Sequence, residues 1–123
     1  MWSFSSHRAK SYLEREDVLE ASQEFYGGPK EFVEFLCRYS EEQSERIIEA
    51  YLNQVGLSKY DPIEDYPQYK VMFEEMDSLL SEEFSGLGLG RCHRIWRKKE
   101  ALLKEKGISW LSPKDMNPWS KFD

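Results

Sequence analysis

The residue types best suited to chemistry gather between Ser85 and Trp96, in the run SGLGLGRCHRIW. A dinucleotide-binding loop needs the pattern G-x-G-x-x-G between a strand and a helix. Here Arg91 stands where the third glycine belongs, and a helix is expected before the loop. A P-loop needs a glycine followed by Lys and Ser or Thr, and the chain contains no such triplet. The run is therefore interpreted as a hinge between two helices.

In the hinge interpretation, Gly86 takes the left-handed conformation that closes one helix, and Gly90 starts the next. Leu87 and Leu89 would then point into the core. An anion-binding site is the functional alternative, because the N–H groups at a helix start attract negative charge. Phosphate, a nucleic-acid backbone or a carboxylate would be the ligand. The candidate residues for this anion site are Gly88, Gly90, Arg91, Arg94 and Lys98.

Cys92 and His93 do not form a convincing metal or nucleophile pair. Adjacent residues lie about 100° apart around a helix, whereas ligands on one helix need a separation such as i, i+4. The remaining histidine and cysteine, His7 and Cys37, would have to converge from distant helices. We therefore expect no metal and no cofactor. We also expect no Cys37–Cys92 disulfide, because intracellular thiols are usually reduced.

Lys99 conflicts with its local pattern. On a helical projection it falls between Ile95 and Leu103, in the middle of an apolar face. Its stem could lie along the edge of the core, with the ammonium reaching water or a carboxylate. Alternatively, Lys99 belongs to a pocket and forms a buried pair with a glutamate or aspartate whose pKa is tuned there. The pattern does not name that partner.

Charge is distributed unevenly in this chain of 123 residues with net charge −6. Residues 1–83 hold 19 acidic and 8 basic side chains, whereas residues 84–123 hold 4 acidic and 9 basic ones. The two ends could offset each other internally, or they could steer partners of opposite sign. The residues assigned to a partner-binding acidic face are Glu41, Glu42, Glu45, Glu49, Glu74 and Asp77.

The elements that must position these residues are expected to be helices. Apolar residues recur at helical spacing over residues 12–26, 32–39, 47–55, 69–84 and 91–106. Gly27-Gly28-Pro29 separates the first two stripes, and Ser40 with Gln43 has the spacing of a capping box. Asp61 can cap a single turn that begins at Pro62. The sequence thus predicts an all-α protein, a compact bundle of about five helices.

The chain is expected to form a single all-helical domain over residues 1–123. The aromatic segment 108–123 is predicted to be non-helical and packed on the bundle, because exposed rings favour aggregation. We expect no signal peptide, because the first residues lack a charged segment followed by an apolar run. No window approaches the roughly 18 apolar residues of a membrane span. We expect a soluble, cytoplasmic protein that does not enter a membrane.

Composition and motifs together favour a small acidic interaction protein without catalytic activity. Its partner is expected to be another, basic protein, bound through the acidic surface of residues 41–53 and 64–83. An inhibitor, or an immunity- or antitoxin-like protein, fits this description by charge. One alternative is a regulator that binds an anion or nucleic-acid phosphate at residues 86–98, although general nucleic-acid binding is not expected of an acidic chain. The other is an enzyme with a site around Lys99. The identity of the partner, the substrate and the oligomeric state stay open.

Overall fold

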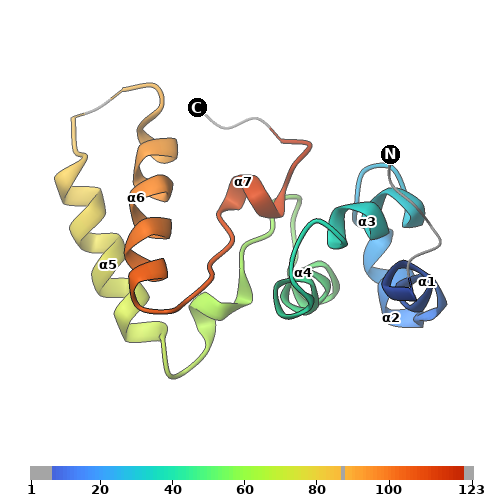
Figure 1. Cartoon of the computed structure of the whole chain (residues 1–123). Coiled ribbons are helices and arrows are strands. Elements are labelled where there is room, and N and C mark those ends of the chain that lie inside the picture. Colours follow the sequence, from blue (N-terminus) through green and yellow to red (C-terminus); the bar gives the residue numbers. More distant parts are fainter. Residues whose placement is uncertain (1–6, 87, 121–123) are drawn as a thin grey trace. The chain divides into compact units, whose positions relative to one another are not determined.

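The described part of the chain is entirely helical. This computed structural model describes residues 7–86 and 88–120, which contain seven α-helices, one 3₁₀ helix and no strand (Figure 1). The chain divides into two compact units, here called the N-terminal unit (residues 1–59) and the C-terminal unit (residues 60–123). The prediction of an all-α protein is confirmed. The single domain over residues 1–123 stays a prediction.

Residues 7–59, the described part of the N-terminal unit, hold four helices where the sequence indicated three. They are α1 (His7–Glu14), α2 (Glu16–Ser22), α3 (Pro29–Leu36) and α4 (Glu41–Asn53). The first expected stripe divides because Arg15 adopts an extended backbone, with φ −90° and ψ 126°, between α1 and α2. Pro29 occupies the first turn of α3, where its missing N–H costs nothing.

The expected capping box opens α4. The Ser40 hydroxyl accepts from the Gln43 N–H at 3.1 Å, and the Gln43 side chain accepts from the Ser40 N–H at 3.2 Å. The helix ends at Asn53, earlier than the apolar stripe suggested. Val55 was therefore wrongly placed in the core, since it lies beyond the helix and is 98 % exposed.

The core of the N-terminal unit is aromatic. Phe32, Phe35 and Tyr51 are buried, and the Phe25 ring lies 5.1–5.9 Å from all three ring centroids. Arg8 ties the helices together: its guanidinium donates to the Leu36 carbonyl at 3.2 Å and to the Ser44 hydroxyl at 2.7 Å. The start of α1, the end of α3 and the first turn of α4 are thus held at one point.

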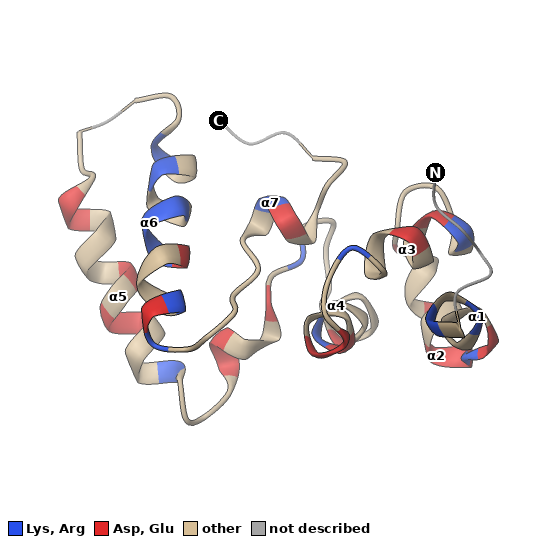
Figure 2. Ribbon diagram, viewed as in Figure 1, with Lys and Arg blue, Asp and Glu red and all other residues tan. Residues whose placement is uncertain are grey.

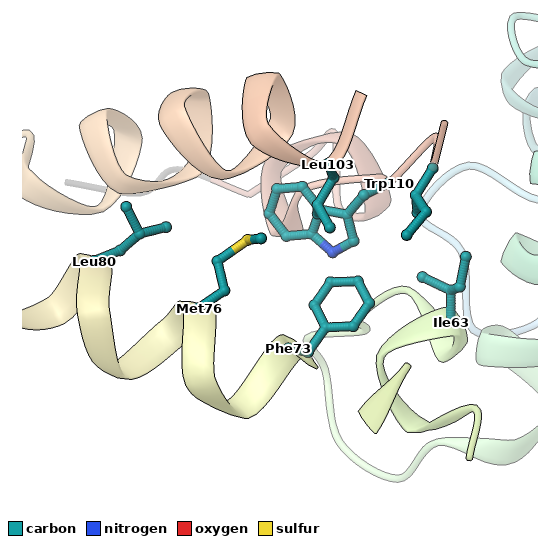
Figure 3. Close-up of a cluster of buried hydrophobic side chains, with 7 residues drawn as sticks. Ile63, Phe73, Met76, Leu80, Leu103 and Trp110 are labelled. Atoms are coloured by element: carbon teal, nitrogen blue, oxygen red, sulfur yellow. The ribbon is translucent and has the colours of Figure 1, made fainter. Parts of the chain in front are cut away.

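The C-terminal unit is built on a pair of neighbouring helices. It comprises η1 (Pro62–Asp65), α5 (Lys70–Glu83), α6 (Arg91–Glu105) and α7 (Pro113–Met116). Figure 3 shows how α5 and α6 face each other across buried side chains, to which η1 and the segment after α6 also contribute. The buried core residues are Ile63, Phe73, Met76, Leu80, Leu103, Ile108 and Trp110.

The C-terminal segment differs in part from its prediction. Ile108 and Trp110 pack in the core, as expected for an aromatic segment that folds back. The segment is not wholly non-helical, because a capping box between Ser112 and Asp115 opens the short helix α7. Together with the break at Arg15, this turn raises the number of α-helices in the described residues above the expected five. Trp119 remains 37 % exposed, and Phe122 lies outside the described residues.

None of the helices in residues 7–86 and 88–120 has both the length and the apolar character needed to cross a lipid bilayer.

Asp61 is completely buried, and both of its carboxylate oxygens accept hydrogen bonds. Oδ1 accepts from the Ile63 N–H at 3.0 Å, as the predicted cap of η1, and Oδ2 accepts from the Leu111 N–H at 2.9 Å. One carboxylate therefore joins two segments 50 residues apart.

Substituting Asp61 should destabilise the C-terminal unit. In Asp61→Ala the buried N–H groups of Ile63 and Leu111 lose their acceptors, which should lower the free energy of unfolding by about 2–4 kcal/mol. Asp61→Asn retains one acceptor oxygen and should lose about half as much. Urea denaturation followed by tryptophan fluorescence measures both. A loss below about 0.5 kcal/mol in Asp61→Ala would contradict this role.

Candidate functional site

Lys99 is buried in the C-terminal unit with two carboxylates and two aromatic rings around its ammonium. The residue is 4 % exposed. Its Nζ lies 2.7 Å from Oδ1 of Asp77 and 3.6 Å from Oε1 of Glu64. It also lies 4.5 Å from the centroid of the Trp110 ring and 5.1 Å from that of Phe73. Distances of this size give favourable cation–π contacts.

Four elements bring this Lys99 cluster together. Lys99 projects from α6 and Asp77 from α5, while Glu64 comes from η1 and Trp110 from the segment after α6. The Trp110 indole N–H donates to Oε2 of Glu64 at 2.8 Å, so the ring and the carboxylate fix each other. In Figure 3 the Trp110 and Phe73 rings lie close together between α5 and α6.

Burial dominates the electrostatics of Glu64. Removal from water raises the pKa of its carboxyl, and the nearby Lys99 ammonium and the Trp110 hydrogen bond partly offset that rise. Asp77 is half exposed, so water screens its pair with Lys99. The ammonium is thus compensated on one side by the partly buried carboxylate of Glu64 and on the other by the more exposed carboxylate of Asp77.

This geometry joins elements and leaves little room for a substrate at the ammonium. Lys99 lines none of the three hollows described below. The sequence left two interpretations of Lys99 open, a core-edge stem with the ammonium reaching water or a carboxylate, and a buried pair in a pocket. The structure places Glu64 and Asp77 beside the ammonium, and the sequence had assigned Asp77 to the partner-binding face. Glu64, Phe73 and Trp110 were missed as members of this cluster. The one available signal was Lys99 itself, since a charge on an apolar face must have partners nearby.

The glycine loop behaves as the predicted hinge. Gly86 and Gly90 both have a φ of +86°, in the left-handed region, and α6 begins directly after Gly90. Leu89 was wrongly placed in the core, because it lies in the turn directly before α6 and is 89 % exposed. Leu87 is outside the described residues.

The cations of the candidate anion site are partly used by the chain itself. Arg91 donates to the carbonyls of Phe84 at 3.0 Å and Ser81 at 2.9 Å, and so holds the loop to the end of α5. Lys98 forms an ion pair with Glu83 at 2.6 Å. The Gly88 and Gly90 carbonyls accept from the Arg91 and Arg94 N–H groups. Arg94 is exposed and lines a shallow hollow of about 410 Å³ with Phe84, Arg97, Lys98 and Ala101.

The acidic residues assigned to a partner-binding face fall into two sets. Glu41, Glu42, Glu45 and Glu49 are exposed on α4 in the N-terminal unit, and Glu74 and Asp77 are exposed on α5 in the C-terminal unit. Arg46 pairs with Glu42 at 3.3 Å, and Arg15 pairs with Glu45 at 2.7 Å. Asp77 pairs with Lys99, as described above.

A polar hollow of about 610 Å³ lies against α4 in the N-terminal unit. It is lined by His7, Arg8, Ser11, Tyr12, Arg15, Glu41, Glu42 and Glu45. Its two arginines serve the fold. Arg8 donates hydrogen bonds to the Leu36 carbonyl and the Ser44 hydroxyl. Arg15 forms ion pairs with Asp17 and Glu45, and these carboxylates raise the pKa of its guanidinium above the usual value.

An apolar groove between α5 and α6 was not anticipated from the sequence. It encloses about 770 Å³ in the C-terminal unit. Its apolar lining consists of Met72, Met76, Leu79, Leu80 and Leu102. Leu79 was expected in the apolar stripe of α5, but it lines this groove and is 67 % exposed.

Charged residues of opposite sign border this α5–α6 groove. Glu75, Glu82 and Glu83 stand on α5, whereas Lys98 and Lys106 stand on α6 and at its end. Figure 2 shows the same contrast along the two ribbons, with acidic residues on α5 and mostly basic residues on α6. The groove is therefore apolar along its floor, acidic along one edge and basic along the other.

No protein-family model, curated protein or solved structure matches this chain. Within the described residues, no group of three or more His, Cys, Asp or Glu side chains is arranged to hold a metal ion. The candidate sites are therefore judged by their own geometry: the Lys99 cluster, the loop and hollow near Arg94, the polar hollow at α4 and the α5–α6 groove.

The Lys99 cluster should contribute strongly to stability. Lys99→Met leaves Glu64 without its cation and should lower the free energy of unfolding by about 3 kcal/mol. Lys98→Met removes an exposed pair from the neighbouring position and should change it by less than about 0.5 kcal/mol. Adding Glu64→Gln to Lys99→Met removes the uncompensated charge yet keeps an acceptor for Trp110, so part of the loss should be recovered. Urea denaturation of the wild type, Lys99→Met, Glu64→Gln and the double variant measures the coupling, and additive losses would contradict it.

The raised pKa of Glu64 predicts a pH dependence. Between the ordinary pKa of 4.5 and the raised value, the folded state binds more protons at Glu64 than the unfolded state does. The contribution of Glu64 to stability therefore falls as the pH rises through this window. Glu64→Gln should remove that fall, whereas Glu74→Gln on the exposed face of α5 should keep it. Unfolding free energies measured from pH 4 upward give the comparison, and identical curves for the wild type and Glu64→Gln would contradict the assignment.

Proposed function

We propose that this protein is a small acidic, non-catalytic interaction protein that binds a basic protein partner through the α5–α6 groove. The observation that carries the proposal is the side chain of Leu79, which is 67 % exposed on an apolar groove bordered by three glutamates. The α5 side of the groove lies within the second of the two acidic stretches, residues 64–83, that the sequence assigned to partner binding.

The apolar character of the groove supports binding of a protein rather than a solute ion. Burying an exposed leucine contributes about 1.5–3 kcal/mol, and the partly exposed Met72 and Leu102 beside it would add to this. Contiguous apolar surface with a polar rim is typical of interaction sites. Leu79 is the exposed leucine of this surface. A single side chain can contribute much of the binding free energy of an interface.

The charges at the edge support a basic partner. Glu83 is paired with Lys98, but no ion pair described in the structure involves Glu75 or Glu82. These two carboxylates leave an excess of negative charge beside the apolar floor. Such an edge would accelerate the encounter with a basic surface and make binding sensitive to salt.

The two alternatives have weaker support. An anion or nucleic-acid phosphate could meet Arg94 and Arg97 in the shallow hollow beside Phe84, but Arg91 and Lys98 already have acceptors in the chain. An enzyme site around Lys99 would need the ammonium to be accessible, and Lys99 is 4 % exposed. Cytoplasmic location and the fit to inhibitors or immunity-like proteins belong to the same proposal, by charge and composition.

Leu79→Lys should abolish partner binding while a matched change on the same helix does not. Val71 is also on α5 and 64 % exposed, but it does not line the groove, so Val71→Lys controls for an added charge. Tagged wild-type protein and both variants are used to capture partners from the cells that make the protein, at low and high salt. One basic protein should be retained by the wild type and Val71→Lys, and its amount should fall more than about tenfold with Leu79→Lys.

Two results would contradict the proposal. The first is equal retention of the captured protein by Leu79→Lys and the wild type, since the groove would then not be the binding surface. The second is retention of nucleic acid in place of a protein, lost when Arg94 and Arg97 are both changed to Gln. Circular dichroism of each variant establishes that it is folded before capture.

A further inference from the structure

We propose that the occupant of the α5–α6 groove is an amphipathic α-helix of the partner, with two basic residues seven positions apart beside its apolar stripe. This inference rests on the proposed function and adds the secondary structure and charge pattern of the partner. It follows from the length of the groove, from its shape and from the spacing of the charges at its edge.

The groove has the length of a short helix. Its α5 lining runs from Met72 to Glu83, which corresponds to about 16 Å of helix at 1.5 Å per residue. Its α6 lining runs from Lys98 to Lys106, about 12 Å. The ion pair between Lys98 and Glu83 places the start of the α6 lining beside the end of the α5 lining, so the two helices are antiparallel here. A third helix of about three turns fits between them.

The shape of the surface favours a helix over a second copy of the same face. Ridges of one helix pack into a groove between two others at the axial distances usual in helical bundles. The α5–α6 face is itself a groove, so the same face of a second copy would oppose hollow to hollow. Met72 and Met76 give the floor flexible, polarisable side chains that adapt to an inserted side chain.

The charges specify the flanks of the incoming helix. Glu75 and Glu82 are separated by seven residues, two helical turns, so they lie on the same side of α5 about 10 Å apart. A partner helix that runs along the groove can meet both with basic residues at positions i and i+7. The opposite edge presents Lys106, which an acidic residue of the partner can meet. The occupant thus has an apolar stripe with a basic flank and an acidic flank.

Two synthetic helical peptides of equal composition test this pattern. Both carry the same leucine stripe in an alanine-rich host. The flank peptide has lysines at i and i+7 beside the stripe, and the back peptide has them on the face opposite to it. Each is labelled and titrated with the full-length protein, with fluorescence anisotropy as the readout. The flank peptide should bind about fivefold more tightly than the back peptide, because exposed ion pairs can lower a dissociation constant by up to about that factor.

Charge reversal on the protein sharpens the test. Glu75→Lys should weaken binding of the flank peptide about fivefold, whereas Glu100→Lys should leave it within about twofold, because Glu100 is an exposed residue of α6 that does not line the groove. A third peptide, with glutamates in place of the two flank lysines, should bind Glu75→Lys more tightly than it binds the wild type. Such a rescue would not follow from a loss of folding in the variant.

Several outcomes would overturn the inference. Equal binding of the flank and back peptides, or equal effects of Glu75→Lys and Glu100→Lys, would contradict the proposed charge pattern. If neither peptide binds while capture of the partner still depends on Leu79, the proposed function stands and the helical occupant is wrong. If sedimentation velocity detects a dimer of the wild type that is absent in Leu79→Lys, the occupant is a second copy of the chain and the inference is wrong.

Discussion

The buried ammonium of Lys99 is the constraint on which the C-terminal unit depends. A charge removed from water is tolerated only where opposite charges and hydrogen-bonding groups surround it. Here those groups come from α5, η1 and the segment after α6. These three elements and α6, which carries Lys99, cannot separate without exposing the ammonium or removing its partners. The separation of α5 and α6, which creates the groove on another face, is set by the same contacts.

The N-terminal unit uses buried cations in a comparable way. Lys59 is 2 % exposed, and its ammonium donates to the Gln54 and Gly56 carbonyls at 2.8 and 2.7 Å, beyond the end of α4. Glu24 accepts from it at 3.2 Å. Arg8 has the same role between α1, α3 and α4. Units of about 60 residues bury a modest apolar core, and such polar anchors fix the chain where that core is thin.

The features predictable from the sequence are those that local physics decides. Helical spacing, the capping box at Ser40 and the left-handed Gly86 follow from neighbouring residues, and the structure contains all three. The carboxylate partners of Lys99, Asp77 and Glu64, lie 22 and 35 residues away along the chain, and no periodicity fixes which carboxylate turns inward. The same limit applies to Leu79, because a stripe shows which face of a helix is apolar but not which part of that face another element covers.

The two faces of the α5–α6 pair explain why an open groove is compatible with a stable unit. One face is closed by Trp110, Phe73 and Ile63 around the Lys99 cluster, which holds the helices without help from the other face. Leu79 therefore does not need to be buried for the unit to fold. A helix pair held on one face would need little ordering of its other face to bind the proposed partner helix. The Lys99 cluster and the α5–α6 groove are thus two parts of one arrangement, with contacts that join the elements on one side and the proposed binding surface on the other.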